Sequence, residues 1–152
     1  MELNTLAQTD IQLSQLGLGT VKFGRNQGVK YPQGFDLPDE KDLASLLDFA
    51  KELGINSLDT APAYGLSEER LGRLLKGQRK DWVIIGKAGE EFENGTSRYD
   101  FTPEHFKMSL ERSLKKLNSD YIDIFLIHSD GNDMDVLSDD LIATMHDFKA
   151  EG

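Results

Sequence analysis

The sequence predicts an α/β fold built on a parallel sheet. Short apolar or β-branched runs alternate four times with segments of helical periodicity, and a polar loop separates each run from its helix. Strands that alternate with helices pair in parallel through right-handed crossovers. A doubly wound sheet and a β/α barrel both satisfy this order. Four units complete neither of them, since a full barrel takes about 250 residues.

The strands are expected where apolar character is most concentrated. The first two are short, whereas the last two are nearly continuous in apolar residues, which is typical of buried parallel strands. The residues before the first strand alternate well enough to form a small hairpin. We therefore expect a single domain over residues 1–152, with a hairpin cap at 1–15, four βα units at 16–152, and strands at 16–20, 56–60, 82–87 and 122–128.

Each strand precedes a helix with recognisable ends. The first helix is expected from about Asp39 to Leu53, and the second to be capped by Ser67. Thr102 and Ser138 are the expected N-caps of the third and fourth helices. The apolar stripes that face the core are expected at Leu43, Leu46, Leu47, Ala50 and Leu53, at Leu71, Leu74 and Leu75, at Phe106, Leu110, Leu114 and Leu117, and at Leu141, Met145 and Phe148.

Composition excludes several classes of protein. The chain carries 27 acidic and 17 basic side chains, for a net charge of −10, which argues against a nucleic-acid partner. Nine acidic residues and one basic residue fall within residues 118–152. No run is apolar enough for a membrane span and no signal peptide is apparent, so we expect a cytoplasmic protein that does not bind membranes. The absence of cysteine and the spacing of the three histidines indicate no metal site.

Chemically capable side chains lie at or near the ends of the expected strands. Asp59, Lys87 and His128 stand there, and Tyr64 follows Asp59 by five residues. The carboxyl ends of barrel strands converge on one face, so we expect these four side chains to meet. We expect Tyr64 to act as an acid, with its pKa lowered by the Lys87 ammonium, and Asp59 to keep that lysine charged. A neutral His128 would orient a carbonyl oxygen toward Tyr64.

Several runs of the sequence resemble the aldo-keto reductase family. The run D-T-A-P-A-Y-G-L-S-E-E-R-L-G at residues 59–72 is similar to a family signature. L-G-L-G-T at 16–20, I-I-G-K at 84–87, S-L-K-K-L at 113–117 and D-Y-I-D-I-F-L-I-H at 120–128 resemble further family segments in the same order. The resemblance implies a (β/α)8 TIM barrel of which this chain holds the first four units. It also implies reduction of aldehydes or ketones to alcohols by hydride from NADPH, or alternatively NADH.

The resemblance also implies roles for individual residues. Carried over by position, the catalytic tetrad of the family falls on Asp59, Tyr64, Lys87 and His128, with Tyr64 as proton donor. Cofactor contacts fall on Gly19, Thr20 and Asp59. The other half of the family barrel supplies most of the cofactor site, so we expect the 152-residue chain to be inactive or impaired in isolation. Its open strand edges are expected to pair with that half or with a second copy.

Other readings of the same residues remain open. Lys87 could form a Schiff base in an aldolase-like barrel, although Asp59 would favour its charged form. The chain could also be a half-barrel fragment or assembly module without catalysis. Aromatic residues in the two long loops, Phe23 and Phe92 among them, are expected to line a carbonyl-substrate pocket, or else to pack the loops down. Trp82 is expected in core or rim packing, and His105 and His146 at the surface or an interface.

Overall fold

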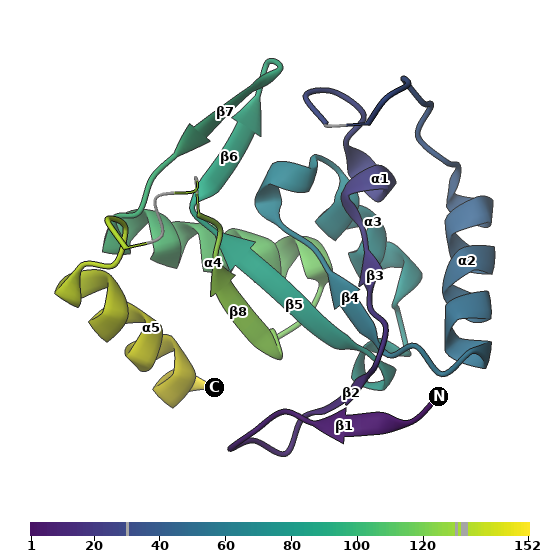
Figure 1. Cartoon of the computed structure of the whole chain (residues 1–152), viewed down its shortest axis with the longest axis horizontal. Helices are drawn as coiled ribbons and strands as arrows, with labels where there is room; N and C mark the ends of the chain where they lie inside the picture. Colours follow the sequence, from purple (N-terminus) through teal and green to yellow (C-terminus); the bar gives the residue numbers. More distant parts are fainter. Residues whose placement is uncertain (30, 130, 132–133) are drawn as a thin grey trace.

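The centre of the fold is a parallel sheet of four strands in the order β3-β4-β5-β8. The computed structural model describes residues 1–29, 31–129, 131 and 134–152. The strands lie side by side in chain order (Figure 1), as predicted. Their bounds are shorter than the apolar runs: β3 is Leu18–Gly19, β4 is Ser57–Asp59, β5 is Val83–Ala88 and β8 is Ile124–Ile127.

The helices follow the predicted order, and two of the three predicted caps, Thr102 and Ser138, are confirmed. Asp39, Thr102 and Ser138 accept hydrogen bonds from backbone N–H groups in the first turns of their helices. The prediction for Ser67 is wrong, because Leu66 is the N-cap and Ser67 is the first helical residue. The helices are α1 (Val21–Gly24), α2 (Glu40–Glu52), α3 (Ser67–Leu74), α4 (Pro103–Leu117) and α5 (Asp139–Glu151), with short 3-10 turns η1 (Pro62–Tyr64) and η2 (Arg79–Asp81).

Two antiparallel hairpins lie beyond the two ends of the sheet (Figure 1). The predicted hairpin is formed by β1 (Leu3–Thr5) and β2 (Gln12–Ser14). The second, β6 (Glu90–Glu93) with β7 (Thr96–Tyr99), was expected to be a loop. Its turn is Asn94-Gly95, with φ of 51° and 80°. An Asn-Gly pair between alternating strands is a strong hairpin signal, and the sequence interpretation did not use it.

The last two strands are not buried on both faces, which corrects the expectation that they are buried throughout. Along β5 the side chains alternate: Ile84 and Ala88 are fully buried, whereas Val83, Ile85 and Lys87 are partly exposed. Partner residues of parallel strands point to the same side, so Leu58 shares the covered face with Ile84. The main core on this face combines β4 and β5 with Phe23, Leu43, Leu47, Ala50, Leu71, Leu75, Trp82 and Leu117.

The core stripe of α2 is narrower than predicted. Leu43, Leu47 and Ala50 are buried, but Leu46 and Leu53 are 39% and 48% exposed, because the helix contacts the body along one narrow line. A second, smaller cluster joins Ala88, Phe106 and Leu141 beside β8 and α5. None of the helices in the described part of the chain combines the length and apolar character that a membrane crossing needs.

Candidate active site

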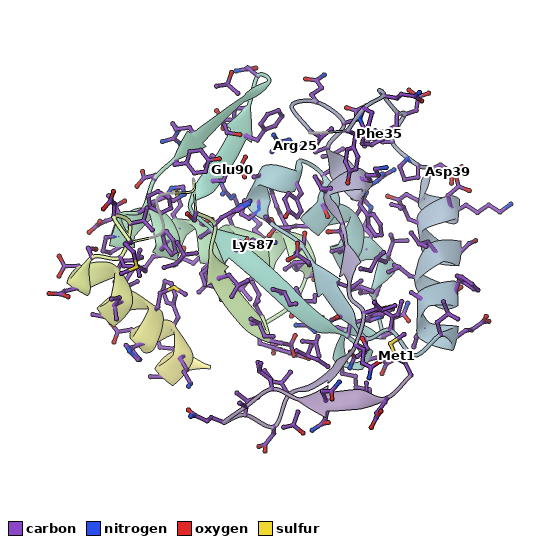
Figure 2. The ribbon with its side chains drawn as sticks, viewed as in Figure 1. Met1, Arg25, Phe35, Asp39, Lys87 and Glu90 are labelled. Atoms are coloured by element: carbon purple, nitrogen blue, oxygen red, sulfur yellow. The ribbon has the colours of Figure 1, made fainter. Side chains whose placement is uncertain are left out.

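The carboxyl ends of β4 and β5 bring an amine, a carboxylate and a phenol together. Lys87 Nζ donates to Asp59 Oδ1 at 2.6 Å, to the Thr60 carbonyl at 3.2 Å and to Tyr64 Oη at 3.2 Å. An ammonium group has three donors, and these contacts use all of them. In Figure 2, Lys87 lies toward the same end of the molecule as Arg25 and Glu90, opposite Met1.

Tyr64 reaches this cluster because η1 follows β4 directly. Its hydroxyl donates to Asp59 Oδ1 at 3.2 Å while it accepts from Lys87. Burial raises the pKa of Tyr64, and the Asp59 and Glu90 carboxylates raise it further, against a small opposing effect of Arg25. The expectation that the pKa of Tyr64 is lowered is therefore wrong, because burial and Asp59 favour the protonated phenol.

His128 follows the end of β8 and lies near Tyr64. The two rings stand edge to face with centroids 5.9 Å apart. Burial lowers the pKa of His128, and Lys87 and Arg25 lower it further, while Glu90 and Asp59 oppose this shift. The imidazole is therefore neutral at neutral pH, as the sequence interpretation expected.

A buried chain of hydroxyl groups supports Asp59 from behind. Ser67 Oγ donates to Thr20 Oγ1 at 2.7 Å, and Thr20 Oγ1 donates to the Asp59 carbonyl at 2.8 Å. Thr60 Oγ1 lies 3.1 Å from Ser67 Oγ, and all three hydroxyl residues are fully buried. Thr20 was expected to contact the cofactor. In this structure its hydroxyl is buried and donates to the Asp59 carbonyl, so contact with the cofactor stays a prediction. No short-range sequence signal indicates this chain, because its members lie on three separate elements.

A buried ion pair flanks the cluster, and the sequence interpretation missed it. Arg25 Nη1 lies 3.2 Å from Glu90 Oε1 and donates at 3.1 Å to the carbonyl of Ala63, the residue before Tyr64. Its other nitrogens donate to the Gln27 and Gly28 carbonyls. A buried arginine opposite the first residue of an unpredicted hairpin carries no local sequence pattern, so only the tertiary structure reveals this pair.

The two aromatic residues expected to line a substrate pocket differ in their surroundings. Phe23 is 2% exposed and belongs to the main core, so it lines no pocket, and that expectation is wrong. Phe92 is half-buried, and the Arg25 guanidinium lies 3.4 Å from the centroid of its ring. Its contact with substrate stays a prediction.

The remaining predictions about single residues divide in the same way. Trp82 is buried in the core and His146 is exposed, as expected. His105 was expected at the surface or an interface; it is only 5% exposed, so the surface position is wrong and the interface position stays a prediction.

The residues present fit one end of a dinucleotide cofactor. Gly19 pairs in register with Asp59, is exposed, and has open space where a Cβ would lie. The Asp59 side chain is 36% exposed, so its carboxylate is accessible to a ribose hydroxyl. Within the described ranges, no cluster of His, Asp and Glu could hold a metal ion.

Comparison with known proteins shows which family and fold the chain matches. The profile of the aldo/keto reductase family matches residues 15–152. A solved structure from Pseudomonas aeruginosa, of a protein assigned to the aldo-keto reductases, is 50% identical with a TM-score of 0.90, over 99% of this chain and 56% of that one. The uncharacterized oxidoreductase YqkF of Bacillus subtilis is 32% identical over 100% of this chain and 46% of its own length.

A third relative is the NADH-specific methylglyoxal reductase of Escherichia coli, which is 33% identical over 81% of this chain and 40% of its own length. The chain therefore spans about half the length of these proteins. Its fold matches the N-terminal half of their β/α barrel, including the parallel sheet and the N-terminal hairpin. The chain belongs to the aldo/keto reductase family.

Proposed function

We propose that the protein reduces aldehydes or ketones to alcohols with a nicotinamide cofactor, and that Tyr64 is the proton donor. The contact of Lys87 Nζ with both the Tyr64 hydroxyl and the Asp59 carboxylate is the observation that supports this most. A phenol beside an ammonium group can release its proton and have the resulting tyrosinate stabilised by the adjacent positive charge. Asp59, as the partner of the lysine, has a positioning role in this proposal.

The residues of the chain divide the work as follows. Tyr64 holds its proton at neutral pH, and its raised pKa makes it a weaker acid while Asp59 accepts from its hydroxyl. The carbonyl oxygen would replace Asp59 as acceptor of the Tyr64 hydroxyl, and the neutral His128 would donate a second hydrogen bond to the same oxygen. The proton then moves from Tyr64 Oη to the oxygen of the substrate as its carbon accepts hydride.

The cofactor, when bound, supplies the hydride. Gly19 would leave room for its flat ring, and Asp59 would accept a hydrogen bond from its ribose. We propose NADPH as the cofactor, with NADH as the alternative. The NADH alternative is supported by the name of the Escherichia coli relative, an NADH-specific reductase. Phosphate-binding residues are proposed to lie in the half of the family barrel that this chain does not span.

Two further features bear on the alternatives. All three donors of Lys87 are engaged, one of them with a carboxylate, which disfavours the free amine that a Schiff-base aldolase requires. The exposed side of the sheet carries apolar residues that include Leu126, which is 42% exposed. We propose that the other half of the family barrel covers this side, with a second copy of the chain as the alternative.

The test is Tyr64→Phe in a complete β/α barrel that contains this chain, assayed with small aldehydes and each of the two cofactors. We expect kcat/KM to fall by roughly 10²- to 10⁴-fold, equivalent to a barrier about 3 to 5 kcal/mol higher. Tyr99→Phe is the matched control, because Tyr99 is exposed on β7 and lies outside the cluster. Turnover by Tyr64→Phe equal to that of the control would show that another group donates the proton.

A further inference from the structure

Glu90 is a buried carboxylate at the carboxyl end of the sheet, and no sequence pattern predicted it there. It is the first residue of β6 and only 8% exposed. Its two carboxylate oxygens have different partners. Oε1 accepts from Ser97 Oγ at 2.6 Å and from Arg25 Nη1 at 3.2 Å, whereas Oε2 lies 3.2 Å from His128 Nε2.

Two donors from other elements hold Oε1, while Oε2 lies beside His128 Nε2. Ser97 is on β7, across the hairpin from Glu90, and Arg25 follows α1. Arg25 is itself held by backbone carbonyls on both sides of the site. The Glu90 carboxylate therefore cannot turn away from the imidazole without breaking contacts to two other elements.

We propose that Glu90 is a positioning residue that keeps the proton of the neutral His128 on Nε2. An ionised carboxylate is an acceptor only, so a neutral imidazole whose Nε2 faces it is most stable with the proton on that nitrogen. Among the described residues none hydrogen-bonds Nδ1, which is buried, so no described acceptor favours the other tautomer. The inference rests on the proposed function only for its consequence in catalysis: a neutral imidazole has one N–H, so a bound carbonyl oxygen would have to share the Nε2–H donor with Glu90.

The charges around His128 agree with this assignment. The described groups that face it are Glu90 on β6, Lys87 on β5, Asp59 on β4 and Arg25 after α1, with the Tyr64 ring at its edge. Glu90 opposes the lowering of the His128 pKa by burial more than Asp59 does. Its carboxylate thus favours a proton on the imidazole ring.

The variant Glu90→Gln tests the inference directly, because the existing hydrogen bonds determine the orientation of the glutamine amide. Ser97 and Arg25 both donate to Oε1, so the glutamine carbonyl oxygen must take that place. Its NH2 group then faces His128 Nε2, which has to become an acceptor. We expect the imidazole proton to move to Nδ1, and the pKa of His128 to fall further.

The measurement is the two-bond proton–nitrogen correlation spectrum of the histidine rings in the full chain, which distinguishes the tautomers without any assay of activity. The wild type is expected to show Nε2–H at His128, and Glu90→Gln is expected to show Nδ1–H. Glu93→Gln, the same change at an exposed residue of the same strand, should leave the wild-type pattern. His146, which is exposed, provides an internal reference.

An Nδ1–H tautomer in the wild type overturns the proposal even if Glu90→Gln fails to fold. An unchanged tautomer in a folded Glu90→Gln protein overturns it as well. If the protein is also a carbonyl reductase, Glu90→Gln should lower kcat by roughly 100-fold with a smaller change in KM, because one donor to the developing oxyanion is lost. A tautomer switch in a complete barrel that lacks reductase activity would support the role of Glu90 and contradict the proposed function.

Discussion

The two faces of the four-stranded sheet differ in what they do. The face under the helices carries Leu58, Ile84 and Ala88, which are fully buried. The opposite face carries Asp59 and Lys87 near the carboxyl ends of the strands and partly exposed aliphatic side chains below them. Adjacent residues of one strand thus have different roles. Those on the first face pack in the core and stabilise the fold, whereas those on the second face form the polar cluster.

The two faces also show how a pattern of apolar residues can give a wrong prediction of burial. β5 and β8 are apolar on both faces, which is the pattern of a strand buried on both sides. In the described structure only one side is covered, and β8 has no fully buried residue. The apolar residues on the open face are those of a strand covered on both sides, and the relatives of this chain are about twice as long as it is.

The largest expected effect comes from truncating neighbouring residues on the two faces. Ile84→Ala should lower the free energy of unfolding of the 152-residue chain by about 2 to 5 kcal/mol, because it opens a cavity in the main core. Ile85→Ala, on the other face, should cost about 1 kcal/mol, since that side chain is already partly exposed. Urea denaturation measures both. Equal costs would mean that the second face is also covered in solution.

A smaller effect is expected where two helices on the covered face touch closely. A Cβ on Gly72 would lie 2.1 Å from the Lys116 carbonyl oxygen, so Gly72→Ala must push α3 away from α4. We expect a loss of about 1 to 3 kcal/mol in thermal or urea unfolding. Gly34→Ala is the matched control, because a Cβ there meets nothing within 4 Å. A Gly72→Ala protein as stable as the control would show that this contact is loose.

The smallest expected effect concerns Glu68, a carboxylate on α3 that is 1% exposed. Burial raises its pKa above the usual 4.5, against the opposing effects of Ser113, Lys116 and Arg112. An acid whose pKa is raised by folding contributes stability below about pH 4.5, and this stability is lost as the pH rises through the folded pKa. Glu68→Gln should therefore increase the free energy of unfolding at pH 7 relative to wild type.

The same comparison at pH 4, where the unfolded carboxyl is largely protonated, should show a smaller difference. The control is Glu69→Gln, the same change at the exposed neighbouring residue, which should not stabilise the protein at pH 7. A gain at Glu68 that did not depend on pH would assign the effect to packing and not to charge.

The sequence predicted well what depends on local pattern. The alternation of strands and helices, two helix caps and the convergence of Asp59, Tyr64 and Lys87 follow from periodicity, capping chemistry and the geometry of parallel strands, whereas the barrel was implied only by the family resemblance. Phe23 was misjudged because the length of its loop gave no sign of the short helix that turns its ring into the core.

Other features could not be predicted because they depend on contacts between distant segments. The pairing of Arg25 with Glu90 joins residues 65 positions apart, and the position of Glu90 depends on a hairpin that was not predicted. The direction of the Tyr64 pKa shift also required the structure. Its sign depends on burial and on the distance to Asp59, neither of which a motif specifies.

The buried hydroxyl groups behind Asp59 also bear on how the site forms during folding. The hydrogen bond from Ser67 to Thr20 closes a loop of 47 residues, and the one from Thr20 to the Asp59 carbonyl closes a loop of 39 residues, so both form only after distant segments have met. Closing such loops costs entropy that the contacts must recover together, which makes the assembly late and cooperative. In a nascent or partly unfolded chain the contacts around Asp59 are therefore not formed. Any activity measured at this site comes from molecules that have folded completely.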